Sequence, residues 1–424
     1  MPIKFQLLLS ILFFQRFLIS YSQDIIYARF VIDTLASEYI AGRGYYNKND
    51  LKAANFIASE FEKFGVQKFG NSYFQYFNIN VNSIVDELFV VLDKDTILAA
   101  IDYLFAPWSC SINGSFRILR IDKNILNDKK KFDKIKKQKH NNRFVLIDTT
   151  GLNNLEFKEE YKKIVNDNIL EAAGVICFDK TLTQSICDEQ KSFVKITLRD
   201  SLRNRALRKI TLKIKSQYQA NYQTQNVVGF VEGQTDTFIL YTAHYDHLGT
   251  MGNKVFFPGA NDNAAGVAMV LDLAKTFSAL QQKPYYSIAF MLFSAEELGL
   301  LGSFYYTEHP IFPLEKIKFV VNLDVVGSGD DGIQIVNSTI FKQQFNLLDS
   351  LNKEHKFVRQ IKQRGAAANS DHYPFYAKGI PSFFIYSLGS YKEYHNIKDT
   401  RHKVPLFAYK GIFGLVYNFA LNIN

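Results

Sequence analysis

The chain has 424 residues, of which 47% are hydrophobic and 21% charged. This composition excludes a disordered protein, and the length exceeds what one modest core requires, which predicts two domains. The net charge of +9 does not indicate nucleic-acid binding, because most of the excess lies in one basic run between residues 128 and 143. Such a run is typical of a solvated helix or hairpin face, with contact to phosphate or a membrane surface as the alternative.

The first 23 residues have the pattern of a secretory signal peptide. Lys4 is followed by an apolar core, residues 7–14 and 17–19, and then by polar residues, which is the order found in export signals. Arg16 interrupts the core, whereas a membrane-spanning helix needs about 20 apolar residues. We therefore predict that residues 1–23 are removed and that the mature protein is periplasmic, cell-surface or secreted. An uncleaved anchor is the alternative, and no other stretch predicts a membrane span.

Three cysteines occur, at positions 110, 177 and 187. An exported protein could form one disulfide from them, with Cys177 and Cys187 the nearest pair, and a thiol would be left over. The spacing fits no zinc knuckle. We favour buried, unreactive cysteines.

The segment before residue 85 predicts two helices and a strand. Apolar residues recur at helical spacing over 24–42 and 50–64. Asn49 or Asp50 can cap the second helix, and Gly65 ends it. Residues 73–79 then read as the first strand of a sheet.

Residues 85–215 have a different texture. Short β-like runs dominate, with one helical pattern between Tyr161 and Ala172. None of the runs ends in a cluster of side chains that bind metals; they are residues 88–92, 116–119, 144–147 and 173–178. The segment predicts a separate, small β-rich domain inserted into the first.

From residue 226 apolar strands alternate with amphipathic helices. We expect strands at 226–231, 237–243, 286–293, 317–323, 332–336 and 382–386, and helices at 264–280, 298–307, 340–354, 371–378 and 405–421. This alternation predicts an α/β fold with a mainly parallel mixed sheet covered by helices on both faces. Residues 24–84 and 216–424 then form one domain, and residues 85–215 are its insert.

Side chains that bind metals follow several of these strands. His244 and Asp246 end one strand, and Asp262 lies in the loop before the next helix. This is the sheet edge at which α/β proteins place their ligands. Taken singly, a His at a strand end is often structural, and Asp262 could simply cap the helix.

The same pattern recurs at later strands. Glu296 and Glu297 follow one strand, Asp324 follows the next, and His395 lies in a loop after the last. The adjacent glutamates could be a charged helix start, but a buried Asp among valines is costly unless paired. Two histidines and three carboxylates together form the ligand set for two zinc-like ions with one bridging carboxylate.

Five motifs in this order resemble peptidase family M28, the aminopeptidase Y-like zinc exopeptidases. They are His244 with Asp246, residues 259–266, 295–299 and 322–327, and Tyr394 with His395. Residues 370–375 and 379–381 fit the same family, as do short stretches between residues 35 and 77. The insert is similar to a protease-associated (PA) domain, chiefly at residues 172–176.

The resemblance implies a role for each residue. His244 and Asp324 would bind one zinc ion, Glu297 and His395 the other, and Asp262 would bridge both; other divalent ions are possible. Glu296 would act as general base and acid, Asp246 would orient His244, and Tyr394 would lie beside the oxyanion. The family often has a cis peptide bond at the position of Asp262 and Asn263.

The expected function is therefore an exported dizinc metallopeptidase that removes N-terminal residues from peptides. A carboxypeptidase of the same superfamily uses the same metal core, and sequence alone separates the two poorly. A glutaminyl-cyclase-like acyltransferase would use one zinc ion, and a non-catalytic receptor-like relative would have lost ligands; the intact set argues against both. His372 is not expected to be a ligand, His247 could support one, and His140, His309, His355 and His402 are expected on the surface.

Overall fold

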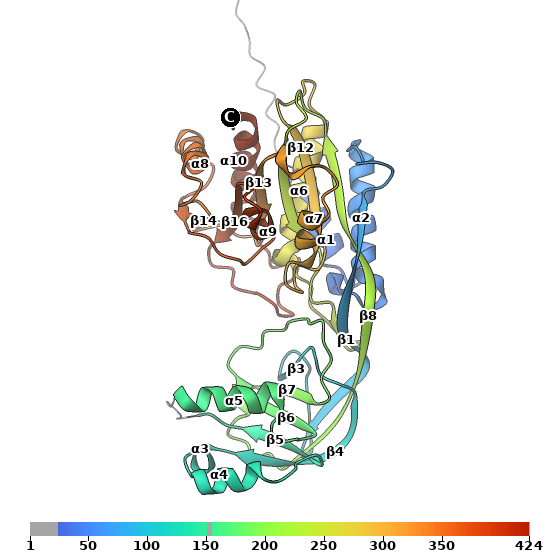
Figure 1. Cartoon of the computed structure of the whole chain (residues 1–424), viewed down its shortest axis with the longest axis vertical. Helices are drawn as coiled ribbons and strands as arrows, with labels where there is room; N and C mark the ends of the chain where they lie inside the picture. Colours follow the sequence, from blue (N-terminus) through green and yellow to red (C-terminus); the bar gives the residue numbers. More distant parts are fainter. Residues whose placement is uncertain (1–23, 151–154, 424) are drawn as a thin grey trace, which may run out of the picture.

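A computed structural model describes residues 24–150 and 155–423. The predicted signal peptide, residues 1–23, lies outside the described residues. Within the described ranges, 24–150 and 155–423, every helix is too short or too polar to cross a lipid bilayer. Figure 1 shows two lobes joined by long strands. Dividing them at the predicted boundaries, we call residues 24–84 and 216–423 the larger lobe and residues 85–215 the inserted lobe.

The larger lobe is built on a mixed sheet whose centre is parallel. Strand β9 lies between β12 and β13 and runs parallel to both, and β13 runs parallel to β16. The outer pairs β8–β12 and β14–β16 are antiparallel. In order across the sheet the strands are β15 (Ile361–Gln363), β14 (Gly332–Val336), β16 (Ser382–Leu388), β13 (Ile317–Leu323), β9 (Phe238–His244), β12 (Ser287–Phe293) and β8 (Lys209–Val231).

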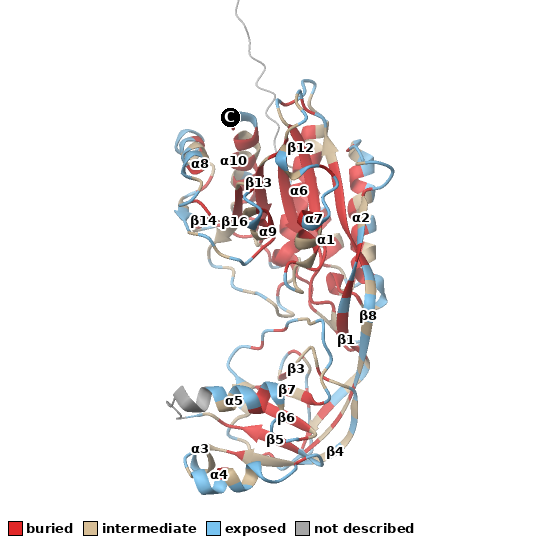
Figure 2. Ribbon diagram, in the orientation of Figure 1, coloured by how far each residue is buried: buried red, intermediate tan, exposed pale blue. Residues whose placement is uncertain are grey.

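Helices cover both faces of this sheet, as predicted. Ile239, Tyr241 and Ala243 of β9 belong to the hydrophobic core on one face, whereas Phe238 and Leu240 belong to the core on the other. This alternation follows from the two-residue period of a strand. The first face is covered by α1 (Ile25–Leu35), α2 (Asn49–Phe64), α6 (Ala265–Ser278), α8 (Lys342–His355) and α10 (Tyr409–Asn422), and the second by α7 (Leu301–Glu308) and α9 (His372–Ala377). Figure 2 shows the sheet as the most deeply buried layer.

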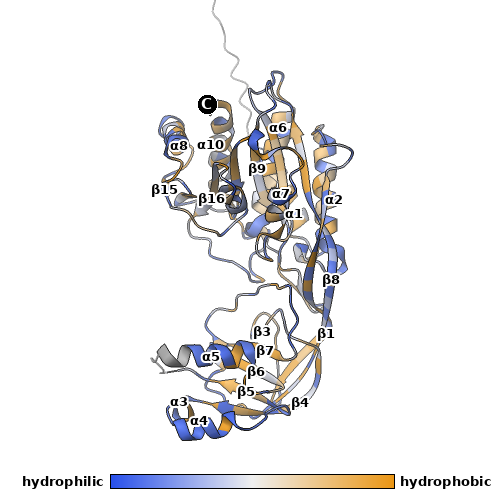
Figure 3. Cartoon of the chain, viewed as in Figure 1, coloured by the Kyte–Doolittle hydropathy of each residue, from blue (hydrophilic) through white to orange (hydrophobic). Residues whose placement is uncertain are grey.

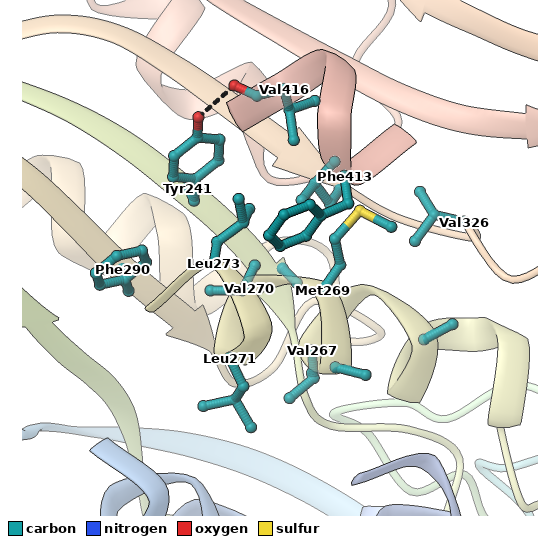
Figure 4. Close-up of a cluster of buried hydrophobic side chains, with 14 of the residues drawn as sticks. Tyr241, Val267, Met269, Val270, Leu271, Leu273, Phe290, Val326, Phe413 and Val416 are labelled. Atoms are coloured by element: carbon teal, nitrogen blue, oxygen red, sulfur yellow. Dashed lines mark hydrogen bonds between the residues drawn. The ribbon is translucent and has the colours of Figure 1, made fainter. Parts of the chain in front are cut away.

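Helix α6 is buried on all sides. Every residue from Ala265 to Ala274 is buried, which is typical of a helix that is apolar around its whole circumference. Figure 4 shows its side chains between the sheet and α10, where the Tyr241 hydroxyl donates a hydrogen bond of 2.6 Å to the carbonyl of Val416. Each buried large apolar side chain contributes about 1.5–3 kcal/mol. This packing fixes the start of α6, which follows the short element η4 that carries Asp262.

Two long strands connect the lobes. β1 (Phe74–Leu92) pairs with β8 in antiparallel register from Phe74 to Leu92 and runs from the larger lobe into the inserted one. The predicted domain boundaries, after residues 84 and 215, fall inside these two strands. The strand expected at 73–79 is therefore much longer than its apolar part.

The inserted lobe contains more helix than the predicted β-rich domain. Four neighbouring strands, β4 to β7, run parallel to one another, and β3 joins β7 in antiparallel register. Helices pack on one face of them; the elements are β2 (Asp95–Ile97), β3 (Tyr103–Phe105), β4 (Ile112–Ile121), α3 (Lys123–Leu126), α4 (Lys129–Lys136), β5 (Arg143–Ile147), α5 (Leu155–Asp167), β6 (Gly174–Asp179) and β7 (Val194–Arg199). The first part of the basic run forms α4, which buries Phe132 and exposes its lysines. Figure 3 draws this helix mainly in the blue of hydrophilic residues.

Some local expectations differ from the structure. The first helix stops at Leu35, and Ala41, Gly42 and Arg43 have positive φ angles that fold the chain back. Asp50 does not cap α2; its buried carboxylate accepts hydrogen bonds from Tyr222 and Thr224. Short elements complete the fold: η1 (Ala41–Arg43), η2 (Tyr46–Lys48), η3 (Asp200–Leu202), β10 (Thr250–Met251), β11 (Val255–Phe256), η4 (Ala260–Ala264) and η5 (Leu314–Lys316).

All three cysteines are free. Cys177 is buried, as expected, whereas Cys110 and Cys187 are only half-buried. Burial raises the pKa of the Cys187 thiol to about 11, so this thiol is protonated and poorly nucleophilic near neutral pH.

Candidate metal centre

The central parallel strands bring their terminal side chains together. His244 is the last residue of β9 and lies opposite Phe293, the last residue of β12. Glu296 and Glu297 follow β12 within three or four residues, and Asp324 follows β13 directly. Because parallel strands end at the same edge, these side chains meet there.

Asp262 lies between two groups of side chains. His244 Nε2 is 3.3 Å from Asp262 Oδ1 and 3.3 Å from Asp324 Oδ1. On the other side, His395 Nε2 is 3.1 Å from Asp262 Oδ2 and 3.1 Å from Glu297 Oε2. The five residues predicted as ligands therefore form two clusters, each facing a different oxygen of Asp262.

The chemistry of these atoms fits two metal ions. Asp262 Oδ2, Asp324 Oδ1 and His395 Nε2 are buried and form no hydrogen bond, although leaving such an atom unsatisfied costs about 1–3 kcal/mol. Their short separations without hydrogen-bond geometry indicate that they point to shared positions rather than to one another. Imidazole nitrogen and carboxylate oxygen are typical zinc ligands. The donor set on each side of Asp262 thus fits one zinc ion.

The segment that carries Asp262 is held from two sides. The Asp399 carboxylate accepts hydrogen bonds from the backbone N–H groups of Asn261 (2.9 Å) and Asp262 (3.1 Å). The fully buried Arg43 donates to the carbonyls of Gly259 (2.8 Å) and Asp262 (2.9 Å). The peptide bond between Asp262 and Asn263 is cis, as the family resemblance led us to expect.

Arg43→Met is expected to destabilise the protein by about 3–5 kcal/mol, because several carbonyls would lose the charged donor that satisfies them. The guanidinium donates to five carbonyls in all, those of Leu35, Tyr245, Pro258, Gly259 and Asp262. Denaturant unfolding measures the effect. Arg29→Met is the matched control, since Arg29 also donates to carbonyls but is only half-buried. Equal midpoints for the two variants would contradict this role.

Asp246 supports His244 and both glutamates. Its Oδ1 lies 3.6 Å from His244 Nδ1, and its backbone carbonyl lies 3.2 Å from the same nitrogen. Its carboxylate also accepts hydrogen bonds from the Tyr45 hydroxyl (2.9 Å) and from the backbone N–H groups of Glu296 (3.1 Å) and Glu297 (3.4 Å). One buried carboxylate therefore orients an imidazole and fixes the turn after β12.

A chain of hydrogen bonds leads to Asp324. Thr242 donates to the Asn322 side chain (2.7 Å), Asn322 donates to the Ser370 hydroxyl (2.7 Å), and Ser370 donates to Asp324 Oδ2 (2.7 Å). Asp324 Oδ1 remains directed at His244. These successive hydrogen bonds fix the orientation of Asp324.

Ser370→Ala is expected to weaken binding of one of two zinc ions about 10–100-fold, the usual cost of removing a hydrogen bond to a metal ligand. Zinc titration of the metal-stripped protein measures this effect. Ser338→Ala is the control, because Ser338 is also buried and hydrogen-bonded but to backbone carbonyls remote from the site. Affinities that equal those of the control would refute the role of Ser370.

Glu296 and Glu297 have opposite electrostatic environments. Burial raises the pKa of Glu296 well above its usual value, and the neighbouring carboxylates of Asp324 and Glu297 add to the increase. Burial acts on Glu297 too, but the imidazoles of His247 and His395, 2.7 and 3.1 Å from its oxygens, lower its pKa to about 2. Two adjacent carboxylates with pKa values pushed apart is a pattern of acid–base sites.

His247 contributes more than the sequence indicated. It is fully buried, and its Nδ1 lies 2.7 Å from Glu297 Oε1. A group of His247, Asp262, Glu297 and His395 has ligand atoms within 4.8 Å of one another. Its position directly after the Asp246 turn was the one signal that could have indicated this role.

Of the remaining tyrosine and histidine candidates, only Tyr394 contacts a predicted ligand in the contacts described below. Tyr394 is about half exposed and stacks on the His395 ring, with ring centroids 3.8 Å apart. His372 is buried next to Ser370 and lies in neither cluster. The predicted surface position is wrong for His140, which is buried with its Nε2 3.1 Å from the carbonyl of Ile135. It is confirmed for His309, His355 and His402, which are exposed.

Comparison with known proteins places this site in a family. The model of peptidase family M28 matches residues 226–420. Aminopeptidase YwaD of Bacillus subtilis is 30% identical over 201 residues, which cover 45% of this chain and 42% of that protein. Leupeptin-inactivating enzyme 1 of Streptomyces exfoliatus is 32% identical over 162 residues, or 38% of this chain and 34% of that protein. The chain thus matches less than half of the length of either relative.

A solved structure shares the fold over nearly the whole chain. BSAP, a zinc aminopeptidase from Bacillus subtilis, superposes with a TM-score of 0.68 at 21% identity, covering 94% of each chain. The superposition therefore includes both the larger lobe and the inserted one. Residues 226–420, the segment that holds the two clusters, thus match the model of peptidase family M28, and the chain shares the fold of a zinc aminopeptidase.

Proposed function

We propose that the protein is a dizinc aminopeptidase that removes N-terminal residues from peptides. The observation that carries the proposal is the position of Asp262, whose two carboxylate oxygens face separate clusters of zinc-type ligands. The match of residues 226–420 to the model of peptidase family M28, the likeness to aminopeptidase YwaD and the fold shared with a zinc aminopeptidase support it.

The distances between these side chains support the following ligand assignment. His244 and Asp324 would hold one ion, Glu297 and His395 the other, and Asp262 would bridge them. The ions, when bound, would supply Lewis acidity and lower the pKa of a water molecule between them. His247 and Asp246 would hold Glu297 and His244 in place through the contacts described above.

Glu296 is the residue proposed to move the proton. Its Oε2 lies 4.0 Å from His244 Nε2, within the group of ligand-type atoms that includes His244 and Asp324, and its side chain is partly accessible. It lies outside the proposed ligand set, so its carboxylate can accept a proton from the attacking water and donate it to the leaving amine. Tyr394, exposed beside His395, would contact the substrate carbonyl as it becomes tetrahedral.

Export is part of the proposal. The pattern of residues 1–23 supports it, and the inserted lobe is proposed to be a PA-like domain on the basis of residues 172–176. Peptides are the proposed substrates; the carboxypeptidase alternative uses the same metal core and differs in which peptide end it recognises.

A panel of aminoacyl-p-nitroanilides tests the proposal. The zinc-loaded protein should release p-nitroaniline from substrates with a free α-amino group, and chelation should abolish the release. Activity that is independent of metal would refute the dizinc mechanism. Activity on N-blocked substrates alone would refute the aminopeptidase assignment while leaving the metal centre in place.

A further inference from the structure

A loop of the inserted lobe reaches the candidate metal centre. The loop joins β6 to β7 through residues 180–193, and in Figure 1 it rises in green towards the larger lobe. The backbone N–H of Gln184 donates a hydrogen bond of 3.0 Å to the carbonyl of His395. The carbonyl of Gln184 in turn lies 3.0 Å from His395 Nδ1. Gln184 is buried by this contact, at 7% exposure.

His395 needs such a contact because its own segment is irregular. The chain between Leu388, the end of β16, and Tyr409, the start of α10, has no regular helix or strand. His395 has φ +50°, in the left-handed region, which costs a residue with a side chain about 1–3 kcal/mol. Two hydrogen bonds of about 1 kcal/mol each can offset that cost.

The contact also determines which ring nitrogen of His395 is free. A proton on Nδ1 that is donated to the Gln184 carbonyl leaves Nε2 with its lone pair. Nε2 is the atom that faces Asp262 and Glu297. Histidines that bind metals usually donate their other ring N–H to a carbonyl or carboxylate, which fixes the tautomer and the ring orientation.

The loop itself is firmly placed. The backbone N–H of Asn82, in β1, donates to the carbonyl of Cys187 (3.0 Å), and the Gln190 side chain donates to Asn82 Oδ1 (2.8 Å). Ile186 packs against the core clusters of both lobes. The position of Gln184 is therefore set by the strand that connects the lobes.

We propose that the inserted lobe completes the second metal site by using the backbone of Gln184 as a positioning group for His395. The proposal rests on the dizinc function proposed above and deepens it. Its consequence is selective: affinity at the His395 and Glu297 cluster depends on the insert, whereas affinity at the His244 and Asp324 cluster does not. The insert is then part of the catalytic unit and not only an accessory domain.

Zinc titration of three metal-stripped proteins tests this inference. Gln184→Pro removes the N–H that donates to His395, whereas Gln184→Ala keeps both backbone contacts and serves as the matched control. We expect Gln184→Ala to bind two ions, each with the same affinity as in the wild type. Gln184→Pro loses the N–H that holds the backbone of His395, so the His395 ring should shift away from the Gln184 carbonyl that accepts from its Nδ1. We expect this variant to bind one ion normally and the other about 10–100-fold more weakly, the usual effect of losing the partner of a ligand histidine.

The outcomes separate this inference from the proposed function. Normal binding of both ions by a folded Gln184→Pro protein would overturn the role of Gln184 and leave the dizinc function standing. A wild type that binds no zinc would overturn the dizinc function itself. If circular dichroism shows that Gln184→Pro does not fold, Ile186→Ser replaces it, since this change loosens the loop without touching the metal cluster. Selective loss of one ion in Ile186→Ser supports the inference, and unchanged binding of both ions overturns it.

Discussion

Glu296→Gln is expected to lower kcat about 10²- to 10⁴-fold, the contribution typical of a general acid–base group. The substitution keeps the shape of the side chain but removes its ability to accept a proton. Because Glu296 lies outside the proposed ligand set, the zinc content should stay at two ions per chain. Steady-state kinetics and metal analysis of the same preparation measure both quantities.

Glu297→Gln is the matched control for this result. Glu297 faces His247 and His395, 2.7 and 3.1 Å away, so its loss should reduce zinc content at that cluster as well as activity. The two adjacent, isosteric substitutions would then reduce activity for different reasons: loss of the proton acceptor in Glu296→Gln and loss of zinc in Glu297→Gln. Wild-type activity in Glu296→Gln, or loss of zinc from it, would refute the general-base assignment.

Removal of the metal ions is the second change with a large expected effect. Asp262, Glu297 and Asp324 are carboxylates in a buried site, and without cations they repel one another. A ligand at 100 to 1,000 times its dissociation constant stabilises the folded state by about 2.7–4.1 kcal/mol. We therefore expect a chelator to abolish activity and lower Tm by several degrees, and added zinc to restore both.

Asp262→Asn is the control for the chelator experiment. It weakens both proposed metal positions, because each oxygen of Asp262 faces one cluster. The Tm of this variant should respond much less to the chelator than that of the wild type. A wild-type Tm that is unaffected by chelation would show that the buried carboxylates are not neutralised by metal.

Much of the fold and the site could be predicted from the sequence because both follow from strand ends. The apolar runs that became β9, β12 and β13 are short and bounded by loops, and they lead to His244, the two glutamates and Asp324. Parallel strands bring such residues to one edge regardless of their separation in sequence. That rule predicted that the residues after β9, β12 and β13 lie together. The order of the motifs indicated the family.

The supporting residues could not be predicted in the same way. Arg43 is about 200 residues from four of the five carbonyls that it binds. Arginine is also rarely fully buried, so the sequence around Arg43 does not indicate its role. Gln184 acts through its backbone, which any residue possesses. His247 was a candidate supporting residue, but its partner could not be predicted because Glu297 lies 50 residues away in the sequence.

The length of β8 was underestimated for a different reason. Its middle part, between Ser216 and Thr224, is polar and mostly exposed, so it lacks the apolar pattern of a buried strand. Pairing with β1 forms the strand there. As a result, the predicted boundaries of the insert fall within a continuous two-stranded ribbon rather than in linkers.

The most direct test of the central claim is the order in which residues leave a peptide whose two ends are free. The zinc-loaded protein is incubated with a synthetic decapeptide, and the products are followed over time by mass spectrometry. An aminopeptidase produces a ladder of peptides shortened one residue at a time from the N-terminus. A ladder that shortens from the C-terminus, or a single internal cleavage, would contradict the assignment.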